Sequence, residues 1–232
     1  MIDFTPWSQM LRTYVAEGEV DYARWQKESA GALDQWLDSI RSVELDSMDR
    51  ESAIAYLINL YNALVIKQVL QKYPIDSIRP EIFGVPNWAS FALFFKRPVY
   101  SLGDRSLSLD NIEHGILRDR YDEPRIHFAL VCAATSCPLL RAEAYTPELV
   151  LDQLEEDAQR FINNSTKVSY DAVGNTLYCS KIFQWYEKDF VAQSGSIANY
   201  IQGYLSEATI PAAASLVYLP YSWQLNDQRT FL

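Results

Sequence analysis

One long segment, residues 50–73, constrains the fold of this chain more than any other. Apolar side chains recur along it at helical spacing and form a broad face: Ile54, Leu57, Ile58, Tyr61, Leu64, Val65 and Val69. Asp49 is suited to cap the helix, and Tyr73-Pro74 ends it, because a residue before proline avoids the helical conformation. We therefore predict one long, buried helix over residues 50–73.

The composition favours one folded domain. The chain has 232 residues, of which 49% are hydrophobic and 13% aromatic, and this supports a substantial core. No internal repeat and no low-complexity linker divides the sequence. We predict a single domain over residues 1–232, in which residues 1–45 form a helical N-terminal extension that packs on the rest.

Charge and hydropathy exclude several classes of partner. The net charge of −10 disfavours binding to nucleic acid or to an anionic membrane, since both need a basic face. No apolar run reaches about 18 residues, so no segment is predicted to span a bilayer. Residues 1–4 lack the features of a signal peptide, and three cysteines are too few for a disulfide scaffold. The sequence thus predicts a soluble cytoplasmic protein with free thiols.

The remaining pattern indicates helices mixed with short strands. The predicted elements are strands at 91–95, 99–102, 168–170 and 176–179, helices at 110–118, 147–163, 180–190 and 196–206, and an extended tail at 217–225. The predicted fold class is α+β, with the long buried helix and further helices packed on a small, mostly antiparallel sheet.

The segment 125–139 carries the candidate chemistry, because it holds one of the two histidines and two of the three cysteines. The apolar run 126–134 predicts a buried strand that ends in a turn at 135–138. Cys137 before Pro138 fits the N-terminus of a helix, where the pKa of a thiol falls and the thiolate becomes a nucleophile. Ser136 and the backbone N–H groups of the turn are candidates to bind substrate as an oxyanion.

Strand geometry separates His127 from Cys137. An extended chain rises about 3.3 Å per residue, which places His127 roughly 20 Å or more from the far end of the strand. A direct pair requires the chain to fold back or the strand to be shorter. Cys132 lies on the face opposite His127 and is interpreted as a buried apolar residue. His127 is therefore a second candidate base or a substrate-binding group.

His114 is the preferred base, because it lies on a separate element. Asp110, His114 and Arg118 are spaced at i, i+4 and i+8, so they share one helix face. A carboxylate one turn away orients a histidine ring and raises its pKa. We assign this role to Asp110 or Glu113, and Arg118 is a candidate to bind substrate.

Two polar residues interrupt the apolar face of the 50–73 helix. Asn59 and Asn62 are spaced at i, i+3, and buried amides are costly unless they have hydrogen-bond partners. One interpretation is that they tie neighbouring loops to the helix. The other is that they line a site and bind substrate.

Metal and redox chemistry are alternatives at the same residues. His114, His127, Cys132 and Cys137 are ligand types that zinc accepts, but their spacing is not that of a zinc ribbon. Cys132 and Cys137 also form a candidate redox pair, although they are five residues apart rather than in a CxxC motif. Phosphate-loop, dinucleotide and Ser-His-Asp signatures are absent. We predict no metal and no cofactor.

Several motifs of the chain occur together in the order of a known family. They are Tyr56–Leu64, Leu109–Arg118, Arg125–Pro138 and Ser180–Tyr186, followed by Tyr221–Asn226. In this order they resemble the DUF547 family, a domain of unknown function. Leu57 stands where the family usually has tryptophan, and Ala134 and Thr135 stand where it often has serine and arginine. The resemblance implies that some relatives join the domain to glutaredoxin-like or DEP modules. Fusion to a glutaredoxin-like module is compatible with thiol chemistry in this domain.

The predicted function is a thiol-dependent hydrolase or acyl transferase that acts on an amide, a peptide or a thioester. Its substrate is then a small molecule or a peptide. A papain- or transglutaminase-like fold is an analogy, in which the nucleophile starts the central helix; this chain has Ser52 there and no cysteine. The alternative function is a non-catalytic binding or scaffolding domain with a buried network of His, Asn and Cys side chains. The sequence does not indicate an oligomeric state.

Overall fold

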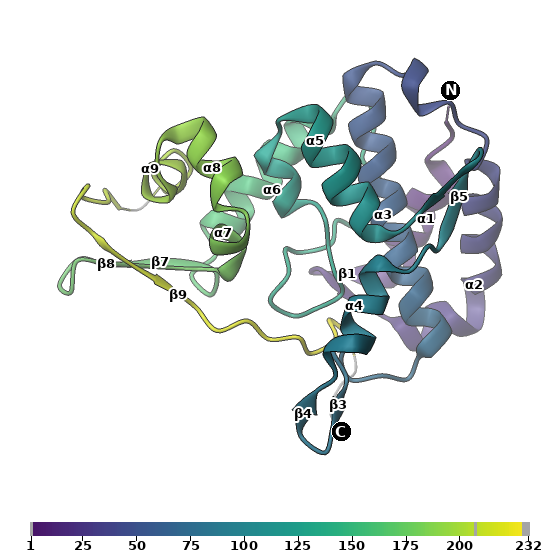
Figure 1. The fold of residues 1–232 in the computed structure, drawn as a ribbon, viewed down its shortest axis with the longest axis horizontal. Coiled ribbons are helices and arrows are strands. Elements are labelled where there is room, and N and C mark those ends of the chain that lie inside the picture. Colours follow the sequence, from purple (N-terminus) through teal and green to yellow (C-terminus); the bar gives the residue numbers. More distant parts are fainter. Residues whose placement is uncertain (1, 207, 229–232) are drawn as a thin grey trace.

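A computed structural model describes residues 2–206 and 208–228, and it combines many helices with short strands (Figure 1). The α-helices are α1 (Thr5–Tyr14), α2 (Tyr22–Ser39), α3 (Arg50–Lys72), α4 (Trp88–Lys96), α5 (Arg118–Tyr121), α6 (Val150–Ile162), α7 (Lys181–Trp185), α8 (Glu187–Ser194) and α9 (Ile197–Gln202). Two 3-10 helices, η1 (Leu45–Ser47) and η3 (Pro124–Phe128), and a π-helix, η2 (Asn111–Leu117), accompany them.

The strands are short and form separate small sheets. They are β1 (Val15–Ala16), β2 (Glu19–Val20), β3 (Glu81–Ile82), β4 (Val85–Pro86), β5 (Tyr100–Leu102), β6 (Arg105–Leu107), β7 (Val168–Asp171), β8 (Thr176–Cys179) and β9 (Ser215–Tyr218). Antiparallel pairs join β1 to β2, β3 to β4, and β5 to β6; β8 pairs with antiparallel β7 and with parallel β9. This content confirms the α+β class. The structure does not confirm the papain- or transglutaminase-like arrangement.

Helix α3 is the centre of the core, as the sequence predicts. The Asp49 side chain accepts a hydrogen bond from the Ser52 N–H, and the helix ends directly before Tyr73-Pro74. Helices α2, η2 and α6 pack against it. Although α3 is long and apolar enough to cross a membrane, 94% of its most apolar window is buried inside the protein. It is therefore a buried core helix of this fold.

Two clusters of buried side chains meet at α6 and η3. The larger cluster surrounds α3 and includes Leu154 of α6 and Ile126 of η3. The smaller cluster lies under α7, α8, α9 and the β7–β9 sheet, and it includes Phe161 of α6 and Phe128 of η3. In Figure 1, α7 to α9 and this sheet lie on one side of α6, and α1 to α3 lie on the other. The short segment η3 thus connects both parts of the core.

The prediction of a strand at 126–134 is wrong. Residues 124–128 form η3, and the chain then continues in irregular structure. Its buried backbone groups find a side-chain partner instead of a neighbouring strand, because Asn62 donates to the Ala129 carbonyl and accepts from the Val131 N–H. An apolar run indicates burial but does not by itself distinguish a strand from other buried conformations.

The predicted strand at 91–95 is helix α4. The Asn87 side chain caps this helix by accepting a hydrogen bond from the Ser90 N–H, and Arg97-Pro98 follows its last turn. The cap and the proline, rather than the apolar run between them, decide the conformation. The other predicted elements occur near their expected positions, although the helix predicted from residue 147 begins at Val150.

Replacement of Asn62 by leucine is expected to lower the free energy of unfolding by about 2–4 kcal/mol, because it leaves a buried carbonyl and a buried N–H without partners. Gln68 supplies a matched control on the same helix. Its amide is also buried, but neither polar atom has a partner among the described residues. Gln68→Met is therefore expected to be neutral or stabilising. Urea unfolding measures the free energy of unfolding of both variants. An equal decrease in Asn62→Leu and Gln68→Met would contradict the role given to Asn62.

Candidate functional site

A cleft of about 600 Å³ opens between α4, η2, α7 and the segment after β9. Its size is that of a small-molecule site. Aromatic rings from distant parts of the sequence cover much of the wall: Trp88, Phe91 and Phe95, Trp185 and Tyr186, and Tyr221 and Trp223. The cleft also contains His114, His127, Cys132 and Cys137. The structure therefore gathers both histidines and two cysteines around one ligand-sized space.

Cys132 and Cys137 are joined by a disulfide at the wall of the cleft. The prediction of free thiols is therefore wrong for this pair, and Cys132 is not the inert apolar residue that we expected. Cys179 has a free thiol, but burial in β8 raises its pKa to about 12 and keeps it protonated. Within the described residues, thiol chemistry depends on the Cys132–Cys137 pair.

Two groups that can donate hydrogen bonds lie beside the sulfur of Cys137. The Cys132 N–H donates to Sγ at 3.1 Å, and the Tyr221 hydroxyl lies 3.1 Å from the same atom. Burial, and then the nearby Glu113 carboxylate, raise the pKa of Tyr221, so its hydroxyl keeps the proton that it can donate. After reduction of the disulfide, both donors would favour a thiolate at Cys137.

The turn at 135–138 lacks the two features that the sequence predicts for it. No helix begins at Pro138, since the next one is α6. Its N–H groups are engaged within the protein: Thr135 donates to Gln224, Ser136 to Ser222 and Cys137 to Ala134. The Ser136 hydroxyl in turn accepts from the Ser222 N–H. The turn is therefore fixed to the segment after β9 and has no free N–H group for an oxyanion.

His127 is buried and forms a hydrogen-bonded pair with Asp189, a partly buried residue near the start of α8. Its Nε2 lies 2.7 Å from Asp189 Oδ2, and its ring stacks on Tyr186 with the ring centroids 3.7 Å apart. Because an ionised carboxylate only accepts hydrogen bonds, Nε2 carries the proton and Nδ1 keeps its lone pair. Nδ1 is buried without a partner among the described residues. A histidine oriented by a carboxylate in this way is equipped to accept a proton.

Arg118 completes the His127–Asp189 pair. Its guanidinium donates to both oxygens of Asp189, at 2.7 and 2.8 Å. Burial raises the pKa of Asp189, but the hydrogen bonds from His127 and Arg118 outweigh burial and hold that pKa well below its usual value. Burial lowers the pKa of His127 by more than its hydrogen bond to Asp189 raises it, which favours neutral imidazole. Arg118 thus positions Asp189, whereas the sequence suggested that it binds substrate.

His114 also lines the cleft, but its surroundings suit a base less well. Its Nδ1 lies 2.9 Å from Arg118 Nη1, and because a guanidinium has only donors, this contact occupies the lone pair of the ring. Among the described residues, no hydrogen bond joins His114 to Asp110 or Glu113. Glu113 instead accepts from the Tyr186 hydroxyl at 2.5 Å. The predicted carboxylate–His114 pairs are therefore replaced by an Arg118–His114 contact.

Asn59 anchors the loop that follows the disulfide. Its Oδ1 accepts from Trp7 Nε1 and from the Tyr145 N–H, and its Nδ2 donates to the Tyr145 and Ala55 carbonyls. No polar atom of Asn59 remains for a substrate. With Asn62, which binds residues 129 and 131, it holds the chain on both sides of the cysteines against α3. The structure thus favours the first interpretation of these amides, that they tie loops to the helix.

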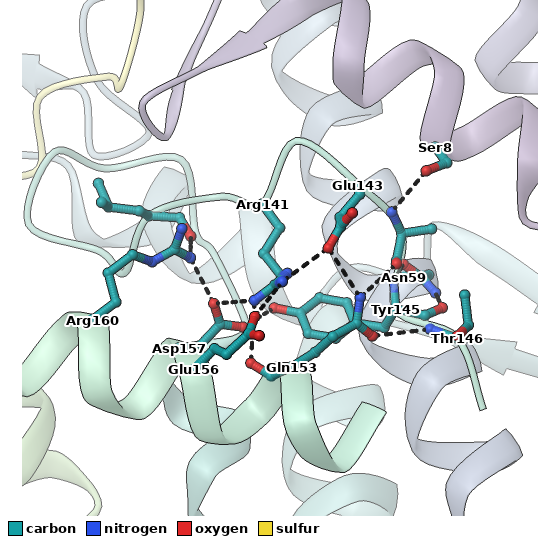
Figure 2. A network of polar contacts seen from close by, with 12 residues as sticks. Ser8, Asn59, Arg141, Glu143, Tyr145, Thr146, Gln153, Glu156, Asp157 and Arg160 are labelled. Carbon is teal, nitrogen blue, oxygen red and sulfur yellow. Dashed lines mark hydrogen bonds and ion pairs between the residues drawn. The ribbon is translucent and has the colours of Figure 1, made fainter. Parts of the chain in front are cut away.

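A charged network extends the same loop onto α6 (Figure 2). Arg141 contacts Asp157 at 3.0 Å, and it also pairs with Glu143 and Glu156. Asp157 is buried, and it receives a further hydrogen bond from the Tyr145 hydroxyl at 2.7 Å. These contacts fix the position of residues 141–145, and thereby one side of the segment that carries Cys137.

The zinc alternative loses ligands in this structure, because the sulfurs of Cys132 and Cys137 are bonded to each other. In residues 2–206 and 208–228, no three His, Cys, Asp or Glu side chains are grouped to hold a metal ion. Nor does any hydrogen bond among these residues join Cys137 to a histidine; its sulfur contacts Tyr221 and the Cys132 N–H instead.

Sequence reasoning missed Asp189, Tyr186 and Tyr221 as site residues. Tyr186 and Tyr221 belong to the motifs 180–186 and 221–226, so these motifs carried a signal that was not used for the site. Asp189 follows the first of these motifs by three residues, and no local pattern distinguishes it from other acidic residues on a helix.

Comparison with known proteins identifies one family. A family described as "Protein of unknown function, DUF547" matches residues 45–162, which include α3, both histidines and the disulfide. No curated protein and no solved structure matches the chain. The match extends over half of the sequence, and it covers the first three of the motifs described above, those at 56–64, 109–118 and 125–138. The chain belongs to the DUF547 family.

Proposed function

We propose that the protein is a thiol-dependent hydrolase or acyl transferase that acts on an amide, a peptide or a thioester. The observation that carries this proposal is one cleft lined by both Cys137 and His127, whose Nε2 lies 2.7 Å from the Asp189 carboxylate. Cys137 is the nucleophile in its reduced form, and His127 Nδ1 is the proton acceptor. Asp189 and Arg118 are positioning residues, because they hold the imidazole in the tautomer that leaves Nδ1 free.

The reaction has two steps. The Cys137 thiol gives its proton to His127, its sulfur attacks the carbonyl carbon, and a thioester to Cys137 forms as the leaving group departs with that proton. Water or an acceptor nucleophile then attacks the thioester, gives its proton to His127, and releases the product. The Cys137 thiolate regains a proton from His127. The Tyr221 hydroxyl and the Cys132 N–H stabilise the thiolate in both steps.

The disulfide favours a second candidate function, thiol–disulfide exchange. In that reaction an external thiolate attacks one sulfur of the Cys132–Cys137 bond, forms a mixed disulfide with it and releases the other cysteine as a thiolate. A second external thiolate then displaces the protein sulfur, so that the pair is reduced and the two external thiols are oxidised to a disulfide. The compartment decides the resting state of either function. The cytoplasm, which the sequence predicts, would reduce the pair and free Cys137, whereas an oxidising compartment would keep it bonded. A binding or scaffolding domain would use the same cleft without covalent chemistry.

Trapping of an acyl-enzyme tests the leading proposal. The reduced protein is mixed with S-phenyl thioacetate, quenched in acid, and mapped by mass spectrometry. We expect an acetyl group on Cys137 and none on Cys179, whose buried thiol is protonated and serves as an internal control. Cys137→Ser should abolish the thioester. Acetylation of surface lysines alone, with Cys137 reduced and unmodified, would overturn the proposal in favour of exchange or binding.

A further inference from the structure

The cleft carries positive charge that the protein does not neutralise. Arg79, Lys96 and Lys181 line it, and among the described residues none of the three forms an ion pair. Other partly buried arginines are paired: Arg125 and Arg141 each contact at least two carboxylates. The chain has 30 acidic and 20 basic residues, so unpaired cations at one cleft stand out from an acidic protein.

Arg79 is held in place by rings rather than by carboxylates. Its guanidinium carbon lies 5.4 Å from the ring centroid of Trp88 and 5.7 Å from that of Trp223. Ring faces stabilise the charge of a guanidinium but leave its in-plane N–H donors unused. Nε is buried without a partner in the described part of the chain. Arg79 is therefore a positioned donor that lacks its usual acceptor, an oxyanion.

Flat apolar surfaces lie beside this donor. Trp88 is 60% exposed and Trp185 is 45% exposed, although both line a concave site. The Trp185 ring stacks on Trp223, with centroids 5.8 Å apart, so the aromatic wall continues from the Arg79 side to α7. Exposed aromatic surface that is gathered in a cleft marks a binding site rather than ordinary surface composition.

The acidic groups of the cleft do not cancel these cations. Glu113 is buried and accepts a hydrogen bond from Tyr186, which leaves Asp110 as the half-buried carboxylate on the wall. The wall therefore carries three basic side chains and two carboxyl groups, a formal excess of one positive charge. This balance suits a ligand with one negative group.

We propose that the cleft binds a ligand that combines a flat apolar group with a single oxyanion, such as a carboxylate. The apolar group packs on Trp88 and Trp185, and the oxyanion pairs with Arg79, supported by Lys181. The inference rests on the proposed function in one respect, because the ligand is taken to be the acyl substrate of Cys137. The binding itself needs no thiol, so it can be measured separately from catalysis.

The test uses the oxidised protein, in which the disulfide blocks catalysis. Two fluorescent probes are titrated: anilinonaphthalene sulfonate, which has aromatic rings and one oxyanion, and phenylnaphthylamine, which has the same rings without the charge. We expect the sulfonate to bind about ten-fold more tightly, as loss of one charge-assisted hydrogen bond changes affinity by roughly that factor. Arg79→Gln and Lys181→Gln should each reduce this preference, and Lys188→Gln, an exposed lysine outside the cleft, should not.

The outcomes separate this inference from the proposed function. Equal affinity for the two probes, or an unchanged preference in both cleft variants, would overturn the anionic ligand even if Cys137 forms an acyl-enzyme. Tighter binding of the sulfonate than of phenylnaphthylamine, lost in Arg79→Gln, would support the anionic ligand even if no acyl-enzyme forms. Circular dichroism checks the fold of each variant, and if Arg79→Gln does not fold, Lys181→Gln and the salt dependence of sulfonate binding decide.

Discussion

Reduction of the Cys132–Cys137 disulfide is expected to raise the rate of acyl transfer by about 10³-fold or more, because a bonded sulfur cannot act as a nucleophile. The measurement is thiophenol release from S-phenyl thioacetate, with and without a phosphine reductant. Cys137→Ser should be inactive under both conditions. Cys132→Ser should be active under both, since its Cys137 thiol has no partner to bond.

The Cys132 variant separates the two candidate functions. Thiol–disulfide exchange needs both sulfurs. If exchange is the function, Cys132→Ser and Cys137→Ser should therefore both lose the exchange reaction. Acyl transfer needs only Cys137. Loss of acyl transfer in both variants, with each folded, would therefore contradict the nucleophile role and favour exchange.

Removal of His127 is expected to produce the second large effect. His127→Ala in the reduced protein should lower the acylation rate about 10²–10⁴-fold, the usual contribution of a general base. His114→Ala should change the rate only a few-fold, because the lone pair of its ring is occupied by Arg118. A larger decrease in the acylation rate for His114→Ala than for His127→Ala would instead identify His114 as the base.

The pH dependence of the rate provides an independent measurement. A base must be neutral to accept a proton, so activity falls as the pH drops through the pKa of His127 in the folded protein. Burial lowers that pKa below its usual value of about 6.5, and activity should therefore persist to correspondingly lower pH. Asp189 raises the pKa of His127. In Asp189→Asn, the fall of the rate on the acidic side of the pH–rate profile should therefore move to still lower pH. A shift of this fall to higher pH would contradict the assigned pair.

The sequence predicts those elements whose signals are local. Helix α3 has a cap at Asp49, a broad apolar face and a proline after its end, and all three signals lie within one segment. The β7–β8 hairpin has a turn sequence between two short apolar runs. The site has no such local signal, because its partners are distant: Asp189 is 62 residues from His127, and Tyr221 is 84 residues from Cys137. Periodicity within a window cannot report such contacts.

The expected separation of His127 from Cys137 depended on one conformation. An extended chain rises about 3.3 Å per residue, whereas a 3-10 helix rises about 2.0 Å. His127 lies in such a helix, and Ala133 then adopts a left-handed backbone, with φ of 64°, before the turn. The chain thus folds back, and both residues reach the same cleft. Alanine gives no indication of this conformation, which glycine or asparagine adopts more readily.

The segment after β9 contributes Tyr221 and Trp223 to the cleft and pairs with the turn beside Cys137. During synthesis, Tyr221 leaves the ribosome 84 residues after Cys137. In the nascent chain, the Cys137 sulfur therefore lacks its Tyr221 contact until nearly all of the described chain has been made. Residues 45–162, which define the family match, include both sulfurs but not Asp189 or Tyr221. A shortened protein with these boundaries would contain His127 and both cysteines without Asp189 and Tyr221, which contact them in the folded protein.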